Sequence, residues 1–132
     1  MTITAFSDAL SSLVIVGVSR RVDTIPIDVN VADLPVQYVT RPSSDYSFFT
    51  FGRVNINPVR TSELTVLVRP VVMGTNNQNY YDVGEMANNV VDALDALITD
   101  ANLDSYQIDL EPRTIHGTDY HAVIATVTGR DK

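Results

Sequence analysis

The amino-acid sequence predicts an α+β fold with a mainly antiparallel sheet, an N-terminal helix and a longer second helix packed on the sheet. Two β-rich runs fill the middle of the chain, the clearest helical stripe follows them, and two more alternating runs close the sequence. This order of helix, strands, helix and strands is typical of an α+β architecture. Because no repeat, low-complexity tract or charge block divides the chain, residues 1–132 are expected to form one domain.

The first expected element is a helix from Ile3 to Val14. Apolar residues recur there at helical spacing, and Asp8 falls on the outer face. The apolar stripe comprises Ile3, Phe6, Leu10, Leu13 and Val14. Because glycine is the residue with which helices most often end, we expect Gly17 to end this one.

The next segment is expected to contain loops and one short strand. The run from Asp23 to Asp33 carries Pro26, which cannot donate a hydrogen bond to a neighbouring strand, so this run suits an edge or a loop. Leu34 to Val39 is expected to be a strand, with Pro35 near its start. The polar residues from Pro42 to Asp45 are expected to break the chain after it.

Two β-rich runs in the middle of the chain predict a long antiparallel hairpin. They cover Ser47 to Asn57 and Glu63 to Met73, and residues 58–62 between them are expected to form the connection. Alternate side chains of a strand point to opposite faces. In the second run one face holds Leu64, Val66, Val68 and Val72, and the other holds Thr65, Leu67, Arg69 and Val71. Both faces are largely apolar and need a cover, for which a helix and a neighbouring subunit are the candidates.

The second helix is expected from Asp82 to Ala101, after a turn-rich loop at residues 74–79. Its apolar stripe comprises Val83, Met86, Ala87, Val90, Val91, Leu94, Leu97, Ile98 and Ala101. Asp82 and Glu85 have the spacing of a capping box, which predicts where the helix begins. Asn102 is expected to end it.

Two alternating runs close the chain and predict the last two strands. They cover Tyr106 to Glu111 and His121 to Thr128. Pro112, Arg113 and a turn at residues 116–119 are expected to join them.

The composition argues against several functional classes. The chain has no cysteine, which excludes disulfides and thiolate chemistry. Its net charge of −7 and its 9 scattered basic residues argue against a surface that grips nucleic-acid phosphates. The N-terminal apolar run has no basic region before it, and no stretch approaches the ~20 apolar residues of a membrane span. Neither a signal peptide nor a membrane segment is therefore expected.

Few residues are candidates for catalysis or metal binding. His116 and His121, with Asp119 between them, match no standard zinc spacing, and turn and strand positions explain them more simply. Asp109 and Glu111 lie two apart on one strand, so their carboxylates would point the same way about 6–7 Å apart. Glycosidases use such a separation, but a solvated strand face is the simpler explanation. With no GxSxG, P-loop or GxGxxG motif, we expect no enzyme, no catalytic residue, no metal and no cofactor.

An aromatic cluster at residues 41–53, RPSSDYSFFTFGR, is the candidate for an intersubunit interface. Adjacent side chains of a strand face opposite sides, so one intramolecular core would cover only part of this cluster. A subunit contact and burial within the chain explain it about equally well, and stacking on single-stranded nucleic acid suits the acidic balance less. The candidate interface residues are Tyr46, Phe48, Phe49, Phe51, Arg53 and Arg60.

Taken together, the order of elements resembles the tail-terminator, or tail-completion, proteins of long-tailed bacteriophages (siphophages). The likeness covers nearly the whole chain and rests on diffuse features rather than on a catalytic signature. The features are the amphipathic N-terminal helix, ADLPVQYV at residues 32–39, ELTVLVRPVVM at 63–73, DVGEMANNVVDALDAL at 82–97 and YQIDLEPRTIHGTDYHAVIATVTGR at 106–130.

The resemblance implies a structural virion protein in the tail and neck region, assembled in the host cytoplasm. It would form a homohexameric ring that caps the tail tube, ends tail elongation and offers a surface to the head connector. The implied partners are further copies of the chain, the tail-tube protein and the connector or neck protein, while genomic DNA passes through the lumen without specific binding. Two alternatives stay open: another small phage neck or tail-tube subunit, and an α+β domain that binds a small ligand or peptide between helix and sheet.

Overall fold

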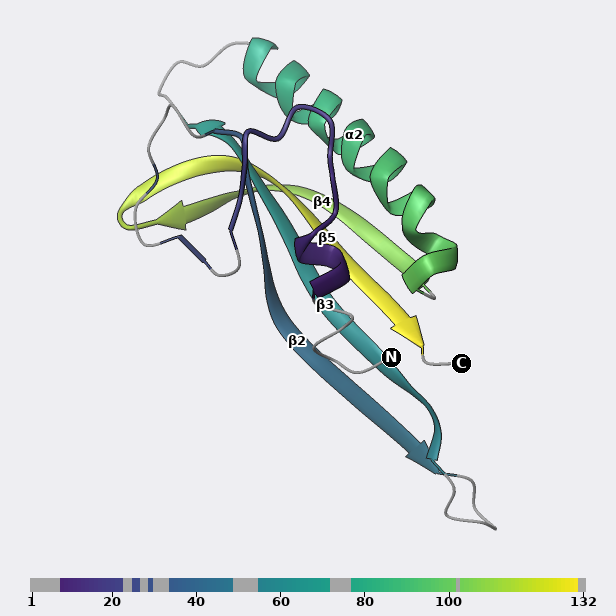
Figure 1. Cartoon of the computed structure of the whole chain (residues 1–132). Helices are drawn as coiled ribbons and strands as arrows, with labels where there is room; N and C mark the ends of the chain where they lie inside the picture. Colours follow the sequence, from purple (N-terminus) through teal and green to yellow (C-terminus); the bar gives the residue numbers. More distant parts are fainter. Residues whose placement is uncertain are drawn as a thin grey trace.

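The structure is a computed structural model that describes residues 8–22, 25–26, 29, 34–48, 55–71, 77–101 and 103–130, with side chains at all of these positions except 41–48, 55–58, 77–81, 99–101 and 130. It confirms the α+β fold, because a long helix and the N-terminal segment lie over one face of a five-stranded sheet (Figure 1). The elements are β1 (Arg20–Arg21), β2 (Val36–Phe48), β3 (Asn55–Pro70), α2 (Asn77–Ala101), β4 (Leu103–Ile115) and β5 (Thr118–Arg130).

The strand order across the sheet is β1-β2-β3-β5-β4. β2 with β3, β3 with β5 and β4 with β5 are antiparallel, as expected, but β1 runs parallel to β2, so the sheet is mixed. The sequence did not predict β1, because it is only two residues long and both of its arginines are exposed. Apolar alternation cannot reveal a strand of this kind.

The long hairpin exists, but its turn was predicted in the wrong place. β2 runs through the expected break at residues 42–45, and β3 runs through the expected connection at residues 58–62, so the connection falls at residues 49–54, outside the described part of the chain. The pairing shifts register between Thr40 and Ser43, around Pro42. An irregularity of this kind lets a strand accommodate a residue that cannot donate a backbone hydrogen bond.

Helix α2 ends at Ala101 as expected but begins at Asn77, five residues before the expected start. The capping box is therefore wrong: Asp82 lies inside the helix, and its carboxylate pairs with Arg69 at 2.9 Å instead. Four residues of the predicted stripe are buried, namely Val83, Met86, Val90 and Leu94. Ile98 is 43 % exposed, so the stripe meets the sheet less closely towards the C-terminal end of the helix.

The N-terminal helix is shorter than expected at its C-terminal end. Within the described residues the chain is helical at 8–11, and residues 13–15 are not helical. Leu13 is buried as predicted, whereas the prediction for Val14 is wrong, because that side chain is 75 % exposed. Ile3 and Phe6 lie outside the described residues.

Polar contacts hold the N-terminal segment on the sheet. The buried amide of Gln37 donates from Nε2 to the carbonyl oxygen of Leu13 at 2.9 Å. On the other side, Nδ2 of Asn89 in α2 donates to the carbonyl oxygen of Val16 at 2.9 Å. Gly17 turns the chain with φ of +91°, a conformation that glycine adopts without steric cost. The segment is therefore fastened to both β2 and α2.

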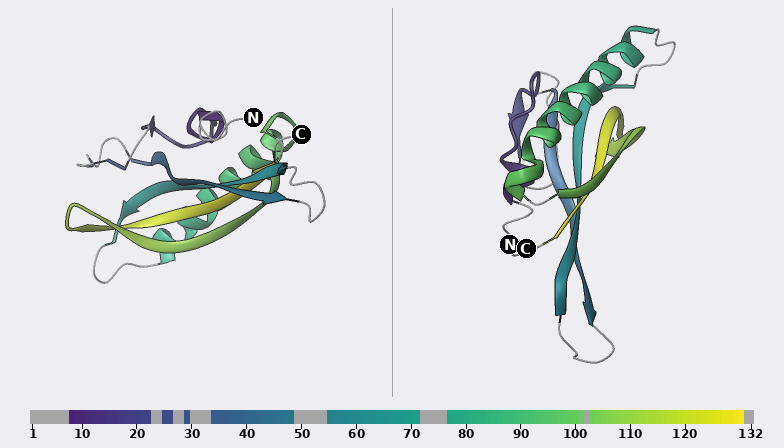
Figure 2. Two further views of the ribbon diagram at one scale, coloured as in Figure 1. Left: turned by 90° about the horizontal axis from the view of Figure 1, so that it is seen from below. Right: turned by 90° about the vertical axis from the view of Figure 1, so that its right-hand side faces the viewer.

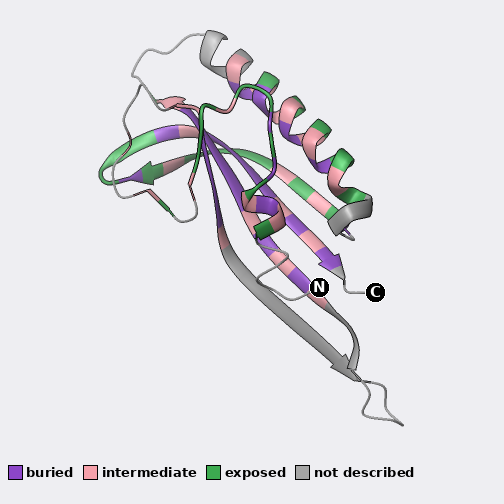
Figure 3. Ribbon diagram, in the orientation of Figure 1, coloured by how far each residue is buried: buried purple, intermediate pink, exposed green. Residues whose placement is uncertain are grey.

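Two apolar cores lie on opposite faces of the sheet. The larger joins α2 and the N-terminal segment to Leu64, Val66 and Val68. The smaller comprises Val36, Tyr38, Leu67, Ile115, Tyr120, Ala122 and Ile124, with Val22, Val29 and Leu34 packed against it. Figure 3 shows the buried positions concentrated in the central part of the sheet. The second face of β3 at Leu67 is thus covered by the chain itself, without the neighbouring subunit suggested above.

Candidate functional site

The feature most suited to an assembly role is the outer half of the β2–β3 hairpin, the hairpin arm. β3 pairs with β5 only as far as Val59, which faces Arg130. Beyond that point β2 and β3 continue and pair with each other, through Ser47 with Ile56 and Phe48 with Asn55, and within the described residues no third strand joins them (Figure 1). A two-stranded ribbon is marginally stable by itself in water. The arm therefore has open backbone edges that a partner can complete.

Three of the predicted interface residues lie in this arm or at its root. Tyr46 and Phe48 belong to the arm part of β2, where the side chains are not described, and Phe49, Phe51 and Arg53 lie outside the described residues. Arg60 lies at the root of the arm, facing Ser44 on one side and Gly129 on the other, and it is 6 % exposed. Arg60 thus has little surface left for a neighbour to cover.

The candidate catalytic residues lie at separate places with local partners. Asp109 and Glu111 are exposed on β4, where Nε2 of Gln107 lies 3.3 Å from Oδ1 of Asp109 and Nη2 of Arg113 lies 3.5 Å from Oε1 of Glu111. The same guanidinium also pairs with Glu63 at 3.0 Å.

The histidines and Asp119 flank the β4–β5 turn. His116 lies in the turn with φ of +49° and is exposed, His121 is half-buried on β5, and the Asp119 carboxylate accepts a hydrogen bond from the Thr114 hydroxyl. Among the described residues, no group of three or more metal-ligating side chains gathers at one place. The absence of an enzymatic site or a metal stays a prediction.

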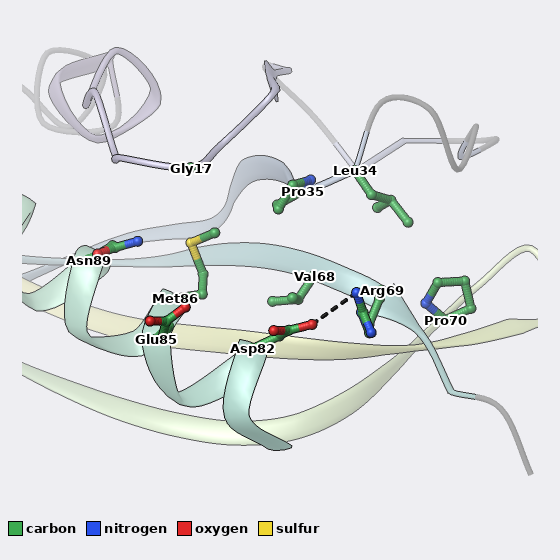
Figure 4. Close-up of a pocket in the computed structure, with 10 residues that line it drawn as sticks. All are labelled: Gly17, Leu34, Pro35, Val68, Arg69, Pro70, Asp82, Glu85, Met86 and Asn89. Atoms are coloured by element: carbon green, nitrogen blue, oxygen red, sulfur yellow. Dashed lines mark ion pairs between the residues drawn. The ribbon is translucent and has the colours of Figure 1, made fainter. Parts of the chain in front are cut away.

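A hollow of about 360 Å³ lies between the N-terminal segment, the end of β3 and the first half of α2 (Figure 4). We call it the helix hollow; it is lined by Gly17, Leu34, Pro35, Val68, Arg69, Pro70, Asp82, Glu85, Met86 and Asn89. Figure 4 shows the Arg69–Asp82 ion pair spanning it from strand to helix. The sequence did not reveal this pair, because its partners belong to different elements and no spacing rule connects them.

Two tyrosines have perturbed acidities. Burial raises the pKa of the Tyr38 phenol in the smaller core, and the positive charge of Arg113 partly offsets this. The pKa of Tyr106 is also raised, chiefly because its hydroxyl donates to Oδ1 of Asp95 at 2.5 Å, a bond that ionisation of the phenol would remove. The hydrogen bond from Tyr106 to Asp95 joins β4 to α2.

The described surface is strongly acidic. The exposed side chains include eight carboxylates, Asp8, Glu85, Asp92, Asp95, Asp104, Asp109, Glu111 and Asp119, but only two basic groups, Arg20 and Arg21. Arg60, Arg69 and Arg113 are buried or half-buried instead. The described part of the chain therefore presents far more negative than positive charge to a partner.

Of the described helices, none combines the length and the apolar character that a membrane crossing requires.

No protein-family model matches the chain, and no curated protein matches its sequence significantly.

Proposed function

We propose that this chain is a structural, non-enzymatic subunit that assembles into a ring and caps the tail tube of a long-tailed phage. The ring would end tail elongation and carry the surface that joins the tail to the head connector in the virion. Its partners would be further copies of the chain, the tail-tube protein and the connector protein, with genomic DNA passing through the lumen.

The hairpin arm is the observation that carries this proposal. Its strands reach past β5, and within the described residues they pair only with each other there. Extended strands that pair with an open sheet edge are a common mode of recognition between chains. In a ring, each arm can reach the next subunit, so a single kind of contact closes the assembly.

The surface charge supports the DNA part of the proposal. Six copies of a chain with net charge −7 carry −42 in total, and at physiological salt this field decays over about 8 Å. An acidic wall repels the phosphates and lets linear DNA pass without adhering.

The central experiment mixes the purified protein with purified tail tubes. We expect a ring of about 87 kDa, six times 14.5 kDa, at one end of each tube, and tubes that no longer elongate when tube subunits are added. Polymerisation of the protein alone into tubes would identify it as a tube subunit, and a failure to bind tubes would overturn the proposal.

A DNA-binding measurement tests the lumen separately. Non-specific duplex binders reach Kd values of roughly 10⁻⁴ to 10⁻⁶ M at physiological salt. We expect no binding in this range near 150 mM salt. Micromolar, salt-sensitive binding would contradict the acidic-wall argument and point to basic groups outside the described residues.

The helix hollow supports a second candidate, the binding of a small ligand or peptide. Its walls combine apolar side chains with the Arg69–Asp82 pair, as ligand sites commonly do. A bound ligand would raise the Tm of the wild-type protein but not that of Glu85→Trp, in which a bulky ring occupies the hollow. Tube capping by both proteins would favour the ring proposal instead.

A further inference from the structure

We infer that the connection between β2 and β3 of one copy docks into the helix hollow of the next copy. This inference rests on the proposed ring and names the surface that receives each hairpin arm. The docking segment comprises residues 49–54, which read FTFGRV and lie between the described ends of β2 and β3.

The helix hollow combines apolar walls with an acidic side. Val68 and Pro70 supply apolar surface from the end of β3. The residues of α2 that line the hollow recur at helical spacing, so they share one stripe of the helix, and they are Asp82, Glu85, Met86 and Asn89. The hollow therefore offers both apolar contact and negative charge.

Of the two carboxylates in the helix hollow, Glu85 is the one open to a partner. Asp82 is paired with Arg69 at 2.9 Å, which balances its charge. Glu85 is exposed, and among the described residues its carboxylate has no hydrogen-bond or ion-pair partner. A cationic side chain that enters the hollow beside Glu85 would gain a charge-assisted hydrogen bond.

The docking segment has the composition that this hollow accepts. Phe49 and Phe51 provide aromatic surface for the apolar walls, and Arg53 is the only charged residue of the segment. An arginine suits a carboxylate because its guanidinium can donate two parallel hydrogen bonds. Residues 49–54 thus bring apolar surface and one positive charge to a site that has apolar surface and one unpaired negative charge.

The other basic residues of a second copy fit the hollow less well. Residues 20–21 and 130–132 are basic, but no aromatic residue lies within five positions of either. Nη1 of Arg21 also donates to the carbonyl oxygen of Ser12 in its own chain. Arg41 belongs to β2 itself. The remaining three are buried or half-buried, namely Arg60, Arg69 and Arg113. Arg53 is therefore the arginine that we assign to Glu85.

The docking segment and the helix hollow belong to opposite ends of β3 and cannot meet within one copy. β3 begins at Asn55, directly after the segment, and ends at Pro70, in the wall of the hollow. At about 3.3 Å per residue, the strand spans roughly 50 Å. Figure 1 shows the hairpin arm and the first half of α2 at opposite ends of the subunit. A segment and a complementary hollow at different places form a head-to-tail contact, which closes into a ring when the rotation permits.

The hairpin arm can enter a neighbour without a clash between the two bodies. Pairing of β3 with β5 reaches no further than Val59, so the strand continues to Asn55 over about 13 Å without a third strand beside it. The hollow, of about 360 Å³, is at the small end of the range for ligand sites. It therefore receives side chains of the docking segment and not whole strands.

Disulfide cross-linking tests the contact, because the chain has no cysteine of its own. Thr50→Cys keeps both phenylalanines and the arginine of the docking segment, and Pro70→Cys places a thiol in the wall of the hollow. The two variants, one carrying a tag, are mixed at about 1 mM protein, where even a contact with millimolar Kd is populated. We expect a disulfide-linked heterodimer of 29 kDa, twice 14.5 kDa, and little homodimer.

A matched control separates docking from random collision. Ile98→Cys places a thiol at a 43 % exposed position of α2, roughly 20 Å along the helix from Glu85, and is mixed with Thr50→Cys under the same conditions. We expect Pro70→Cys to cross-link about tenfold faster than Ile98→Cys. Glu85→Cys, at an exposed position where a substitution costs little stability, provides a second thiol in the hollow. If neither hollow thiol cross-linked faster than Ile98→Cys, the inference would be overturned.

A charge exchange tests the choice of Arg53 and Glu85. Arg53→Glu in the Thr50→Cys chain should slow cross-linking to Pro70→Cys by about two- to fivefold, the range for an exposed ion pair. Glu85→Lys in the Pro70→Cys chain should restore the rate, whereas Asp92→Lys, the same charge change at an exposed position of the same helix, should not. These effects should vanish near 1 M salt, where the screening length is about 3 Å. Equal restoration by both lysines would show that overall charge acts and would overturn the pairing.

A filled hollow keeps this inference apart from the proposed function. Glu85→Trp should lose both the cross-link and the capping of tubes. If the wild-type protein and Glu85→Trp cap tubes equally well, the docking inference fails and the proposed function stands. If the cross-link is specific but the wild-type protein does not cap tubes, the self-contact stands and the proposed function fails.

Discussion

Strands β2 and β3 pass from the body of the sheet into the hairpin arm, and the two halves are supported differently. In the body, Tyr38 faces Thr65 and Val39 faces Leu64, and all four side chains are buried. In the arm, Ser47 faces Ile56 and Phe48 faces Asn55, and among the described residues no third strand pairs with them. The first five residues of β2 read VQYVT and the remaining eight read RPSSDYSF, so the strand becomes more polar towards the arm.

This difference shows that backbone pairing between β2 and β3 does not by itself determine how stable each part of the hairpin is. Hydrogen bonds between two strands contribute little net free energy, because water offers the same bonds to the unfolded chain. Burial beneath α2 stabilises one face of the body, and burial in the smaller core, against which Val22, Val29 and Leu34 pack, stabilises the other. We therefore expect body substitutions to change folding and arm substitutions to change assembly, and each prediction below tests one side of this division.

The largest effect on folding is expected from Leu94→Ala. Leu94 is fully buried in the core between α2 and the sheet, and truncating such a leucine costs about 2–5 kcal/mol because a cavity remains. Urea unfolding measures the change in the free energy of unfolding. Ile98→Ala, about one turn further along the helix at a position that is 43 % exposed, is the control and should cost less than about 1 kcal/mol. A loss below about 0.5 kcal/mol for Leu94→Ala would contradict the placement of the helix on the sheet.

An arm substitution, Phe49→Asp, is expected to block assembly and leave a folded monomer. Phe49 follows the last described residue of β2 in the sequence. A charge there should disturb the proposed subunit contact but change the free energy of unfolding by less than about 0.5 kcal/mol. Size exclusion and tube capping measure assembly, and urea unfolding measures stability. Ile98→Asp puts the same charge on α2 and should assemble normally. If Phe49→Asp assembled into normal rings, Phe49 would not belong to the subunit interface.

The parts of the fold that the sequence predicted correctly are those with strong periodicity. Val83, Met86, Val90 and Leu94 recur at helical spacing and are buried against the sheet as expected. The run around Leu64 alternates and both of its faces are covered, although the chain itself covers the second face and not the neighbouring subunit suggested for it. The spacing of apolar side chains indicates which positions are buried, and the tertiary structure buries these positions.

The parts that were predicted wrongly depend on turns and on contacts between distant segments. Pro42 and Pro58 suggested breaks, yet both lie within strands, because an irregular register and an edge position tolerate proline. Asp82 suggested a helix start but pairs with Arg69 across the helix hollow. The pattern also assigned Val14 to the apolar stripe of a helix that stops earlier, although its side chain is 75 % exposed. The residues around a position do not show which distant segment it will contact.

A smaller effect is expected from breaking the Arg69–Asp82 ion pair, which joins the end of β3 to α2. Its side chains are 43 % and 24 % exposed, so water screens the pair and Asp82→Asn should cost about 0.2–1 kcal/mol. The loss should shrink near 1 M salt, as urea unfolding at two salt concentrations would show. Asp92→Asn, at an exposed position of the same helix, is the control. A salt-independent loss would mean that Asp82 acts through packing rather than charge.

The smallest expected effect is a change of stability at high pH, caused by the two tyrosines of the body. The folded-state pKa values of Tyr38 and Tyr106 are raised, whereas an unfolded tyrosine ionises near about pH 10. A raised pKa means that the folded state holds the phenolic proton more tightly. This contribution to stability is therefore complete below about pH 10 and is lost as the pH rises through the folded pKa.

Absorbance titration of the phenols distinguishes the two causes. In the wild-type protein we expect Tyr38 and Tyr106 each to ionise at a higher pH than a free tyrosine. Tyr38→Phe should remove one of these high-pH ionisations, because burial raises the pKa of the Tyr38 phenol. The variant should also lose less stability than the wild type as the pH rises above about 10. Asp95→Asn should lower the pH at which Tyr106 ionises, because the charged acceptor of the Tyr106 hydrogen bond is gone. If Asp95→Asn left the ionisation of both tyrosines unchanged, the bond between β4 and α2 would not persist in solution, and β4 would be held against α2 by packing alone.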